Sequence, residues 1–310
     1  WEMYEDANFL VVTNPLNALQ RVAAYHRNKF DIPVIGITGS NGKTVVKEWL
    51  YQILQQDFNI THSPRSYNSQ IGVPLSVWQM NENTQLGIFE AGISQPEEMS
   101  RLEAIIRPTI GILTNIGQAH QEGFKSMKQK CLEKLELFIN CDVIVCEEEN
   151  ELIDECMEIA CLSHKRLTWS KKGSPKSPLY IKKIEKKNIS TIIHYAILGM
   201  ESKVSIPFTD DASIENAIHV IATAFYLHVK PAQLAERMPT LEPVAMRLDV
   251  RQGKNNCTLI NDSYNSDINS LNIALDFLVQ RATINEQKKT LIISDIPQSG
   301  LALKELYYLA

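Results

Sequence analysis

Residues 33–44 read PVIGITGSNGKT, and this stretch decides the fold. Its first half, 33–38, is a short apolar run of the kind that forms a buried strand. A glycine-rich turn follows, and a helix is predicted over 43–56 with an apolar face made of Trp49, Leu50, Ile53 and Leu54. A strand, a glycine turn and a helix in this order form the context of a phosphate-binding loop.

The turn carries the residues that phosphate chemistry requires. Gly39 and Gly42 let backbone N–H groups curl around phosphate oxygens, and the start of the helix adds a favourable dipole. Lys43 is predicted to reach the β- and γ-phosphates of a nucleotide, and the Thr44 hydroxyl is predicted to bind Mg²⁺.

Two further features qualify this motif. Ser40 and Asn41 are expected to shape the nucleotide-binding loop rather than to react. The spacing departs from GxxxxGK[ST], because position 37 is isoleucine and the first glycine stands one residue earlier. A chance glycine turn is therefore the alternative interpretation.

Outward from this loop, apolar runs alternate with helical patterns. That alternation predicts a parallel sheet covered by helices on both faces. The further strands are expected at 85–91, 109–115 and 142–146, and the helices at 96–106, 126–140 and 150–160. Residues 165–208 contain short β-like runs and predict a small antiparallel annex, which a helix over 213–228 follows.

A domain boundary is expected near Pro239 and Pro243. A second α/β unit should follow it, with strands at 247–251, 258–261 and 290–294 and a helix at 267–279. The predicted fold class is α/β, with a central P-loop ATPase domain (33–239) built on a parallel sheet and a truncated, Rossmann-like C-terminal domain (240–310). The start, WEMYED, has neither an initiator Met nor a signal-peptide pattern, so we expect a piece of a longer chain.

Composition excludes several classes of protein. The 310 residues include 31 Lys plus Arg and 36 Asp plus Glu, a net charge of −5, which argues against a general nucleic-acid binder. No apolar run approaches the ~20 residues that cross a bilayer, so no membrane association is expected. The six cysteines form no CxxC pair and predict reduced thiols in the cytoplasm.

Three charged residues outside the loop are candidates for metal chemistry. Glu90 ends an apolar strand, where a carboxylate is costly unless it is used, although a helix cap or a surface acid is the alternative. His120 lies in a polar loop, where a lone histidine is usually only solvated. Lys134 lies on a helix whose apolar residues are expected to face the core, and apolar neighbours favour an uncharged, nucleophilic amine. A surface lysine would give a similar pattern. The apolar residues of that helix are Leu132, Leu135, Phe138 and Ile139.

The segment TGSNGKT resembles the ATP loop of the Mur ligase family, which joins amino acids or a dipeptide to peptidoglycan precursors. Further segments, in the family's order, resemble its ligases of the MurF type, which add D-alanyl-D-alanine to UDP-N-acetylmuramoyl-tripeptide. These segments are SYNSQIGVPL (66–75), EAGIS (90–94), TN (114–115) through HQEGF (120–124), EKLELF (133–138), AMRL (245–248) and NDSYNS (261–266). Several resemble most closely the proteins in which an alanine racemase is fused to the ligase.

The resemblance implies an ATP-dependent ligase that forms an amide bond through an acyl phosphate. It implies two Mg²⁺ ions held by Thr44, Glu90, His120 and a carbamylated Lys134. For the nucleotide, the resemblance implies Asn216 at adenine, Asp262 at the ribose and Arg247 at the γ-phosphate. The alternatives are a polar residue at a helix start for Asn216 and surface salt bridges for Arg247 and Asp262. Tyr264 and Asn265 are implied for the nucleotide or the incoming amine, and Asn68 for the muramoyl-peptide or for positioning the reacting carboxylate. The family often has His-Asn shortly before the asparagine at 216, where this chain has Ala212 and Ser213, so part of the adenine contact differs.

The same resemblance makes residues 1–32 a remnant of the N-terminal domain that holds the UDP part of the substrate, together with a linker. We therefore expect this chain to bind ATP poorly or moderately and to ligate little. Two alternatives remain: a ligase like folylpolyglutamate synthase, and a non-catalytic nucleotide-binding module of a fused racemase. A P-loop kinase fits less well, because no kinase lid or acceptor motif is present.

Overall fold

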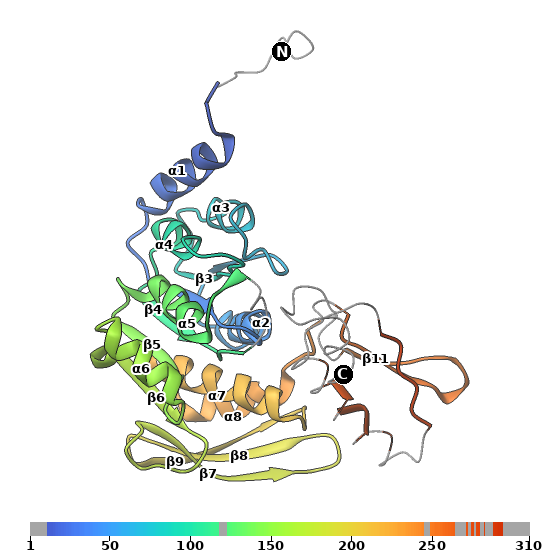
Figure 1. Ribbon diagram of the computed structural model, residues 1–310. Coiled ribbons are helices and arrows are strands. Elements are labelled where there is room, and N and C mark those ends of the chain that lie inside the picture. The colour runs from blue at the N-terminus through green and yellow to red at the C-terminus, as the bar shows by residue number, and fades with distance from the viewer. Residues whose placement is uncertain are drawn as a thin grey trace.

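The computed structural model describes residues 11–117, 123–244 and 249–263, and part of the following segment (271, 274, 275, 277–279, 282 and 288–293). Within these residues the chain forms a nine-stranded sheet with the order β2-β3-β1-β4-β5-β6-β7-β8-β9 and a separate antiparallel pair, β10 and β11 (Figure 1). This mixed α/β architecture with a large, mostly parallel sheet agrees with the predicted fold class.

The strands of the large sheet are β1 (Val34–Thr38), β2 (Ile60–His62), β3 (Leu86–Glu90), β4 (Ile110–Leu113), β5 (Val143–Glu147), β6 (Arg166–Ser170), β7 (Leu179–Lys186), β8 (Thr191–Ile197) and β9 (Met200–Ile206). The described helices are α1 (Pro15–Arg27), α2 (Lys43–Leu54), α3 (Gly72–Val77), α4 (Met99–Ile106), α5 (Met127–Leu135), α6 (Glu151–Ile159), α7 (Asp211–Tyr226) and α8 (Pro231–Arg237), with short 3-10 turns η2 (Glu136–Phe138), η3 (Ser163–Lys165), η4 (Met238–Thr240) and η5 (Lys254–Asn256). In the part of the chain that the structure describes, none of these helices is long and apolar enough to cross a membrane.

The central strands are buried along their whole length. Every residue of β1, β3 and β4 is buried, because helices cover both faces of the parallel part of the sheet. The register pairs Ile37 with Glu90 and Thr38 with Leu113, so the carboxyl ends of the three strands meet at one edge. In open parallel sheets this edge is where ligands bind.

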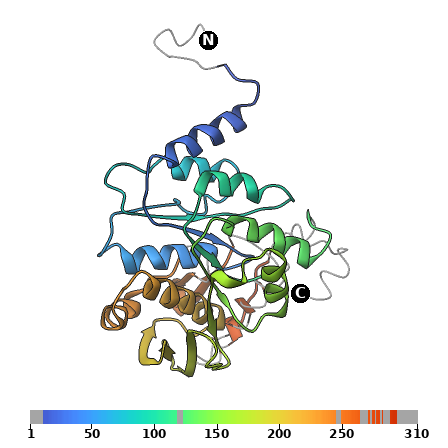
Figure 2. The same ribbon diagram turned by 90° about the vertical axis from the view of Figure 1, so that its left-hand side faces the viewer.

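Two hydrophobic cores lie on the two faces of this sheet. One contains the apolar sides of α2 and α7, including all four residues predicted for the apolar face of α2. The other contains residues of α1, α3, α4, α5 and α6. Figure 2 shows α2 and α7 on one side of the sheet and α3 and α4 on the other.

Helix α1 was not predicted from the sequence. It packs against α3 and α4, with Ala23 in the second core. The buried Arg27 guanidinium donates to the backbone oxygens of Ile106 (2.8 Å) and Arg107 (3.1 Å), which lie at the end of α4. These contacts fix α1 to the helical layer that covers the parallel strands.

The prediction of a separate antiparallel annex over 165–208 is wrong in one respect. Strands β6 and β7 continue the large sheet in parallel with β5, and only β8 and β9 run antiparallel. The reason is that Trp169, Leu179, Ile181 and Ile193 are apolar and join the same core as β1 and α2, so the segment buries them by extending the sheet.

The predicted helix over 126–140 ends earlier than expected. Helix α5 stops at Leu135 and continues as the 3-10 turn η2. A 3-10 turn has three residues rather than 3.6, which rotates the residues that follow it. Leu135 and Phe138 are buried as predicted and Leu132 is half-buried, but Ile139 is 52% exposed, so its predicted place in the core is wrong.

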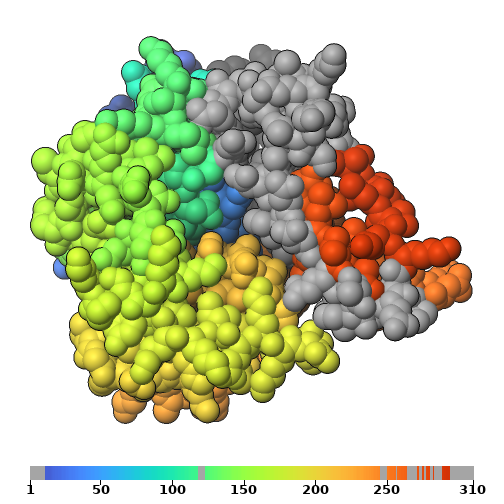
Figure 3. All heavy atoms as spheres, turned by 60° about the horizontal axis from the view of Figure 1, so that its bottom comes forward, coloured from blue at the N-terminus to red at the C-terminus, as the bar shows by residue number. Residues whose placement is uncertain are grey.

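Beyond residue 244 the described residues are fewer. Strands β10 (Asp249–Gln252) and β11 (Thr258–Asn261) form where strands were predicted. The expected strand at 290–294 is wrong over its described part, because residues 290–293 form no strand and β10 and β11 pair only with each other. Figure 3 views the molecule from the side of β7–β9 and shows the orange-red residues that follow 249 at one flank of that face.

Candidate active site

The loop 39–42 connects the carboxyl end of β1 to α2 and adopts a backbone that requires glycine. Gly39 has φ 144° and Gly42 has φ 83°, a region that side chains rarely tolerate. A Cβ atom at Gly42 would lie 2.3 Å from Asn216 Oδ1, and one at Gly39 would lie 2.0 Å from Thr114 Oγ1. Neighbouring side chains therefore leave room only for glycine at both positions.

The end of β4 holds this loop in place. The backbone N–H of Ser40 donates to Asn115 O (2.9 Å), and the N–H of Asn41 donates to Asn115 Oδ1 (3.0 Å). The Thr114 hydroxyl donates to Asn41 O (2.5 Å). Ser40 and Asn41 thus have the loop-shaping contacts expected of them.

Two lysines meet at one carbonyl of the loop. Lys43 Nζ donates to Gly39 O (2.9 Å) and Ser40 O (3.1 Å), and Lys134 Nζ donates to the same Gly39 O (3.1 Å). Lys134 is only 3% exposed. Its burial, followed by the positive charges of Lys43 and Lys130, holds the pKa of Lys134 well below its usual value. The site therefore favours an uncharged amine at Lys134.

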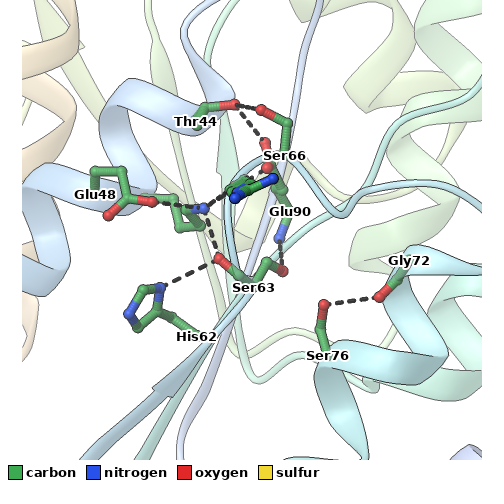
Figure 4. A network of polar contacts seen from close by, with 10 residues as sticks. Thr44, Glu48, His62, Ser63, Ser66, Gly72, Ser76 and Glu90 are labelled. Carbon is green, nitrogen blue, oxygen red and sulfur yellow. Dashed lines mark hydrogen bonds and ion pairs between the residues drawn. The ribbon is translucent and has the colours of Figure 1, made fainter. Parts of the chain in front are cut away.

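Three oxygen-bearing side chains converge beside the loop (Figure 4). Thr44 Oγ1 donates to Glu90 Oε2 (2.9 Å) and lies 3.0 Å from Ser66 Oγ. Glu90 is fully buried at the end of β3. Mg²⁺ prefers oxygen ligands and usually takes one or two carboxylates together with water and phosphate oxygens, so this donor set fits that ion. Among the described residues no three His, Cys, Asp or Glu side chains gather into a metal site, and the hydroxyls supply the other donors here.

A cavity of ≈ 410 Å³ opens next to Gly42. Asn216 on α7 and Asp262, just after β11, contribute polar groups to its lining. One wall is apolar, where the rings of Trp49 and Phe208 stack with their centroids 4.8 Å apart. Such a cavity, mostly apolar with a few polar groups, suits a planar heterocycle attached to a phosphate.

Most of the residues that form this site lie within a segment that matches a known protein family. The Mur ligase middle domain matches residues 37–224, which include the loop, the oxygen cluster and most of α7. The chain belongs to the Mur ligase family.

Several relatives within this family are ligases of the MurF type. The UDP-N-acetylmuramoyl-tripeptide–D-alanyl-D-alanine ligase of Bacillus subtilis is 27% identical over 299 residues, which are 96% of this chain and 63% of that protein. A crystal structure of MurF from Acinetobacter baumannii superposes with a TM-score of 0.85 at 25% identity and covers 98% of this chain and 66% of that one. A MurF ligase from Thermotoga maritima in complex with ADP shares the fold, with a TM-score of 0.74 at 22% identity over 89% of this chain and 64% of that one. These matches confirm the resemblance to MurF-type ligases, and this chain spans less than two thirds of the relatives' length.

The structure brings most of the predicted Mur ligase site residues together. Nine of them lie in or beside the phosphate-type loop, and a tenth, Asp262, lies on the wall of the adjoining cavity. The nine are Gly39, Ser40, Asn41, Gly42, Lys43, Thr44, Glu90, Lys134 and Asn216. Asn68 lies near the end of β3, where its backbone oxygen accepts from the N–H of Gly92 (2.8 Å). Predictions for His120, Arg247, Tyr264 and Asn265 fall outside the described residues.

Three polar residues beside this loop were not predicted from the sequence. Ser66 lies within the quoted segment 66–75, yet no signal marked its hydroxyl as a neighbour of Thr44. His219 and Lys47 are polar residues on helices and look like surface positions in the sequence. Both are buried, and only contacts with distant segments reveal it: His219 Nε2 lies 3.0 Å from Thr114 O, and Lys47 Nζ donates to Ser63 O (2.6 Å).

Proposed function

We propose that this chain is part of a ligase that catalyses the ATP-dependent addition of D-alanyl-D-alanine to UDP-N-acetylmuramoyl-tripeptide. The observation that carries the proposal is the bond from Thr44 to the buried Glu90 carboxylate beside a phosphate-type loop. Matches along nearly the whole chain to ligases named for this reaction support it. An ADP molecule in the T. maritima relative supports ATP as the nucleotide.

In the proposed reaction, the terminal carboxylate of the tripeptide attacks the γ-phosphorus of ATP, which gives an acyl phosphate and ADP. The amine of D-alanyl-D-alanine then attacks the acyl carbon, and phosphate leaves from the tetrahedral intermediate. Lys43, which bonds two loop carbonyls here, would turn to the β- and γ-phosphates. No covalent enzyme intermediate is needed, so positioning and electrostatics carry the catalysis.

Mg²⁺ bound by Thr44 and Glu90, with His120 and Lys134, would neutralise the charge that develops on the phosphoryl group. We assign the γ-phosphate also to Arg247, since a planar guanidinium suits a dense negative charge. With Lys43 in the 33–239 unit and Arg247 in the 240–310 unit, closure of the two units would assemble the site.

The cavity supports a binding mode for the nucleoside. Asn216 would bind adenine and Asp262 the ribose hydroxyls, because both are polar groups on an otherwise mostly apolar lining. Asn68 is assigned to the muramoyl-peptide, and Tyr264 and Asn265 to the nucleotide or the incoming amine. The N-terminal residues 1–32 are assigned to the end of the domain that holds the UDP group.

Lys134 is proposed to be carbamylated. Its neutral amine would attack the carbon of CO₂, and the nitrogen would release a proton to solvent as the N–C bond forms, leaving a carbamate anion. The low pKa of the buried amine supports this step, because only the uncharged form is nucleophilic. A ¹³C carbamate resonance on addition of ¹³C-bicarbonate, absent in Lys134→Met, would test it.

Two wider assignments accompany the ligase. All six cysteines are free thiols, which supports a reducing compartment such as the cytoplasm. The sequence around 66–76 supports the proposal that an alanine racemase is fused to the ligase, and the size of the parent protein on an immunoblot would test that.

The experiment is phosphate release by the intact parent protein with ATP, Mg²⁺ and UDP-N-acetylmuramoyl-tripeptide, with and without D-alanyl-D-alanine. We expect release that depends on the dipeptide and is lost in Glu90→Gln. Release that ignores both the dipeptide and the sugar nucleotide would contradict the proposal. Release that requires a folate and glutamate would instead support a folylpolyglutamate-type ligase.

A further inference from the structure

Lys47 is a fully buried cation one helical turn beyond Thr44. Residues three apart on a helix share a face, so Lys47 and Thr44 both face the end of β3. A buried ammonium is costly unless it is paired and hydrogen-bonded. The partners of Lys47 therefore show what the charge is used for.

Those partners come from separate parts of the chain. Lys47 Nζ donates to Ser63 O (2.6 Å) and to Arg65 O, both in the segment after β2. It also forms ion pairs with Glu48 Oε1 (2.8 Å) on its own helix and Glu90 Oε1 (3.8 Å) at the end of β3. Glu48, Ser63 and Glu90 surround a common point in Figure 4.

The segment 63–66 is held in an unusual backbone shape by these contacts. Arg65 has φ 49°, a left-handed conformation that costs a non-glycine residue about 1 kcal/mol or more. The carbonyl of Arg65 bonds Lys47, and the next residue, Ser66, places its hydroxyl 3.0 Å from Thr44 Oγ1. Ser63 Oγ in turn accepts from the N–H of Glu90 (3.3 Å).

Glu90 is oriented by the same arrangement. Its Oε1 faces Lys47, and its Oε2 accepts from Thr44. We propose that Lys47 is a positioning residue, which fixes Glu90 and the 63–66 segment so that the Thr44, Ser66 and Glu90 oxygens are preset for Mg²⁺. This inference rests on the proposed function, since it deepens the metal site of that reaction.

Two effects of Lys47 on a bound cation oppose each other. Its positive charge repels Mg²⁺, so a role as a charge alone predicts tighter metal binding when the charge is removed. Positioning predicts weaker binding, by about 10- to 100-fold, the range seen when groups that orient metal ligands are removed. The direction of the change therefore separates the two roles.

The experiment compares Lys47→Met with Lys128→Met in the full chain. Lys128 lies on α5 in an exposed ion pair with Glu155, so its substitution is a matched control. Binding of Mn²⁺ alone is measured by electron paramagnetic resonance, and hydrogen exchange at 63–67 is measured in metal-free protein. We expect Lys47→Met to weaken Mn²⁺ binding about 10- to 100-fold and to speed exchange at 63–67, with no change in Lys128→Met.

Unchanged or tighter Mn²⁺ binding in a folded Lys47→Met protein overturns the inference and leaves the proposed function standing. A wild-type chain that binds no Mn²⁺ overturns the proposed metal site and this inference with it. If Lys47→Met does not fold, Glu48→Gln carries the test, because it removes a half-buried partner of Lys47 without touching the oxygen cluster. A smaller loss of Mn²⁺ binding is then expected, and no loss overturns the inference.

Discussion

His219 carries a defined proton arrangement in the interior. The Trp169 indole N–H can only donate, and it donates to His219 Nδ1 (3.3 Å). The proton of the neutral imidazole must then be on Nε2, which donates to Thr114 O (3.0 Å). Thr114 in turn donates from its hydroxyl to Asn41 O of the phosphate loop. The uncharged His219 therefore stabilises the loop indirectly, through its hydrogen bond to Thr114.

This arrangement predicts a pH dependence of stability. Burial lowers the pKa of His219 to about 4, below its ordinary value of 6.5. Between these values the unfolded state binds more protons than the folded state, so the free energy of unfolding should fall as pH falls from 6.5 to 4. The expected contribution of His219 is roughly 3 kcal/mol, fully lost below pH 4.

Urea unfolding of wild type and His219→Gln at a series of pH values measures this effect. The glutamine variant should be less stable at pH 7 but should lose less stability on acidification. Parallel pH profiles for the two proteins would contradict the assignment.

Buried polar residues mark the limit of prediction from this sequence. Lys43, Thr44 and Glu90 could be predicted because a glycine loop and a strand end are local patterns. Lys47 and His219 could not, because their partners lie in 63–65, 90, 114 and 169, and only the tertiary fold brings these segments together.

At the scale of elements, the phosphate loop packs closely against α7, because Gly42 of the loop lies beside Asn216 of the helix. Gly42→Ala would place a Cβ 2.3 Å from Asn216 Oδ1 at a φ of 83°, so we expect a loss of stability of about 1–3 kcal/mol. Adding Asn216→Ala removes the clash but not the backbone strain. The double variant should therefore be more stable than the sum of the two single effects, by about 0.5–3 kcal/mol. Urea unfolding of the four proteins measures this coupling, and additivity of the two effects would show that the contact is not limiting.

The contact of α1 with α4 gives a second prediction at this scale. Arg27→Met would remove the donors to Ile106 O, Arg107 O and Phe30 O while keeping an apolar side chain. We expect a loss of roughly 1.5–3 kcal/mol in thermal or urea unfolding. Arg21→Met, at an exposed position of the same helix, is the control and should stay within about 0.5 kcal/mol of wild type. Equal effects of the two substitutions would show that α1 is not docked through Arg27.

Elements were predictable where burial on both faces leaves a continuous apolar run. Strands β1, β3, β4 and β5 were located within a few residues for that reason. Helix α2 was located from the helical spacing of its apolar face. Strand β2 has three residues and helix α3 has six, which are too few for a periodic signal. The extension of the sheet by β6 and β7 depends on which neighbour a strand finds, and local sequence does not encode that.

At the scale of the whole molecule, the nucleotide cavity joins distant parts of the chain. Its lining combines Asn216 and Trp49 from two helices with Asp262 and Phe277 from the C-terminal part. A ligand that binds only the folded chain stabilises it, by about 2.7 kcal/mol at a concentration 100 times its Kd. Mg²⁺-ADP should therefore raise the unfolding temperature.

Differential scanning fluorimetry with increasing Mg²⁺-ADP measures this stabilisation. Asp262→Ala should shift the rise in unfolding temperature to higher ADP concentration. Lys128→Met, at an exposed residue that is not part of the cavity lining, should respond like wild type. A wild-type chain with no ADP-dependent rise would rule out nucleotide binding at this cavity.

The position of β1 between β3 and β4 has a consequence for synthesis on the ribosome. Strand β1 is synthesised before both of its neighbours, so its apolar residues stay unpaired until β3 and β4 have been made. The later of the two, β4, ends at Leu113. At about 5–20 residues per second that interval lasts roughly 4–15 s, during which the nascent chain exposes the strand that leads into the phosphate loop. The first strand of the catalytic unit is thus a segment that a ribosome-associated chaperone would need to shield until β4 has been made.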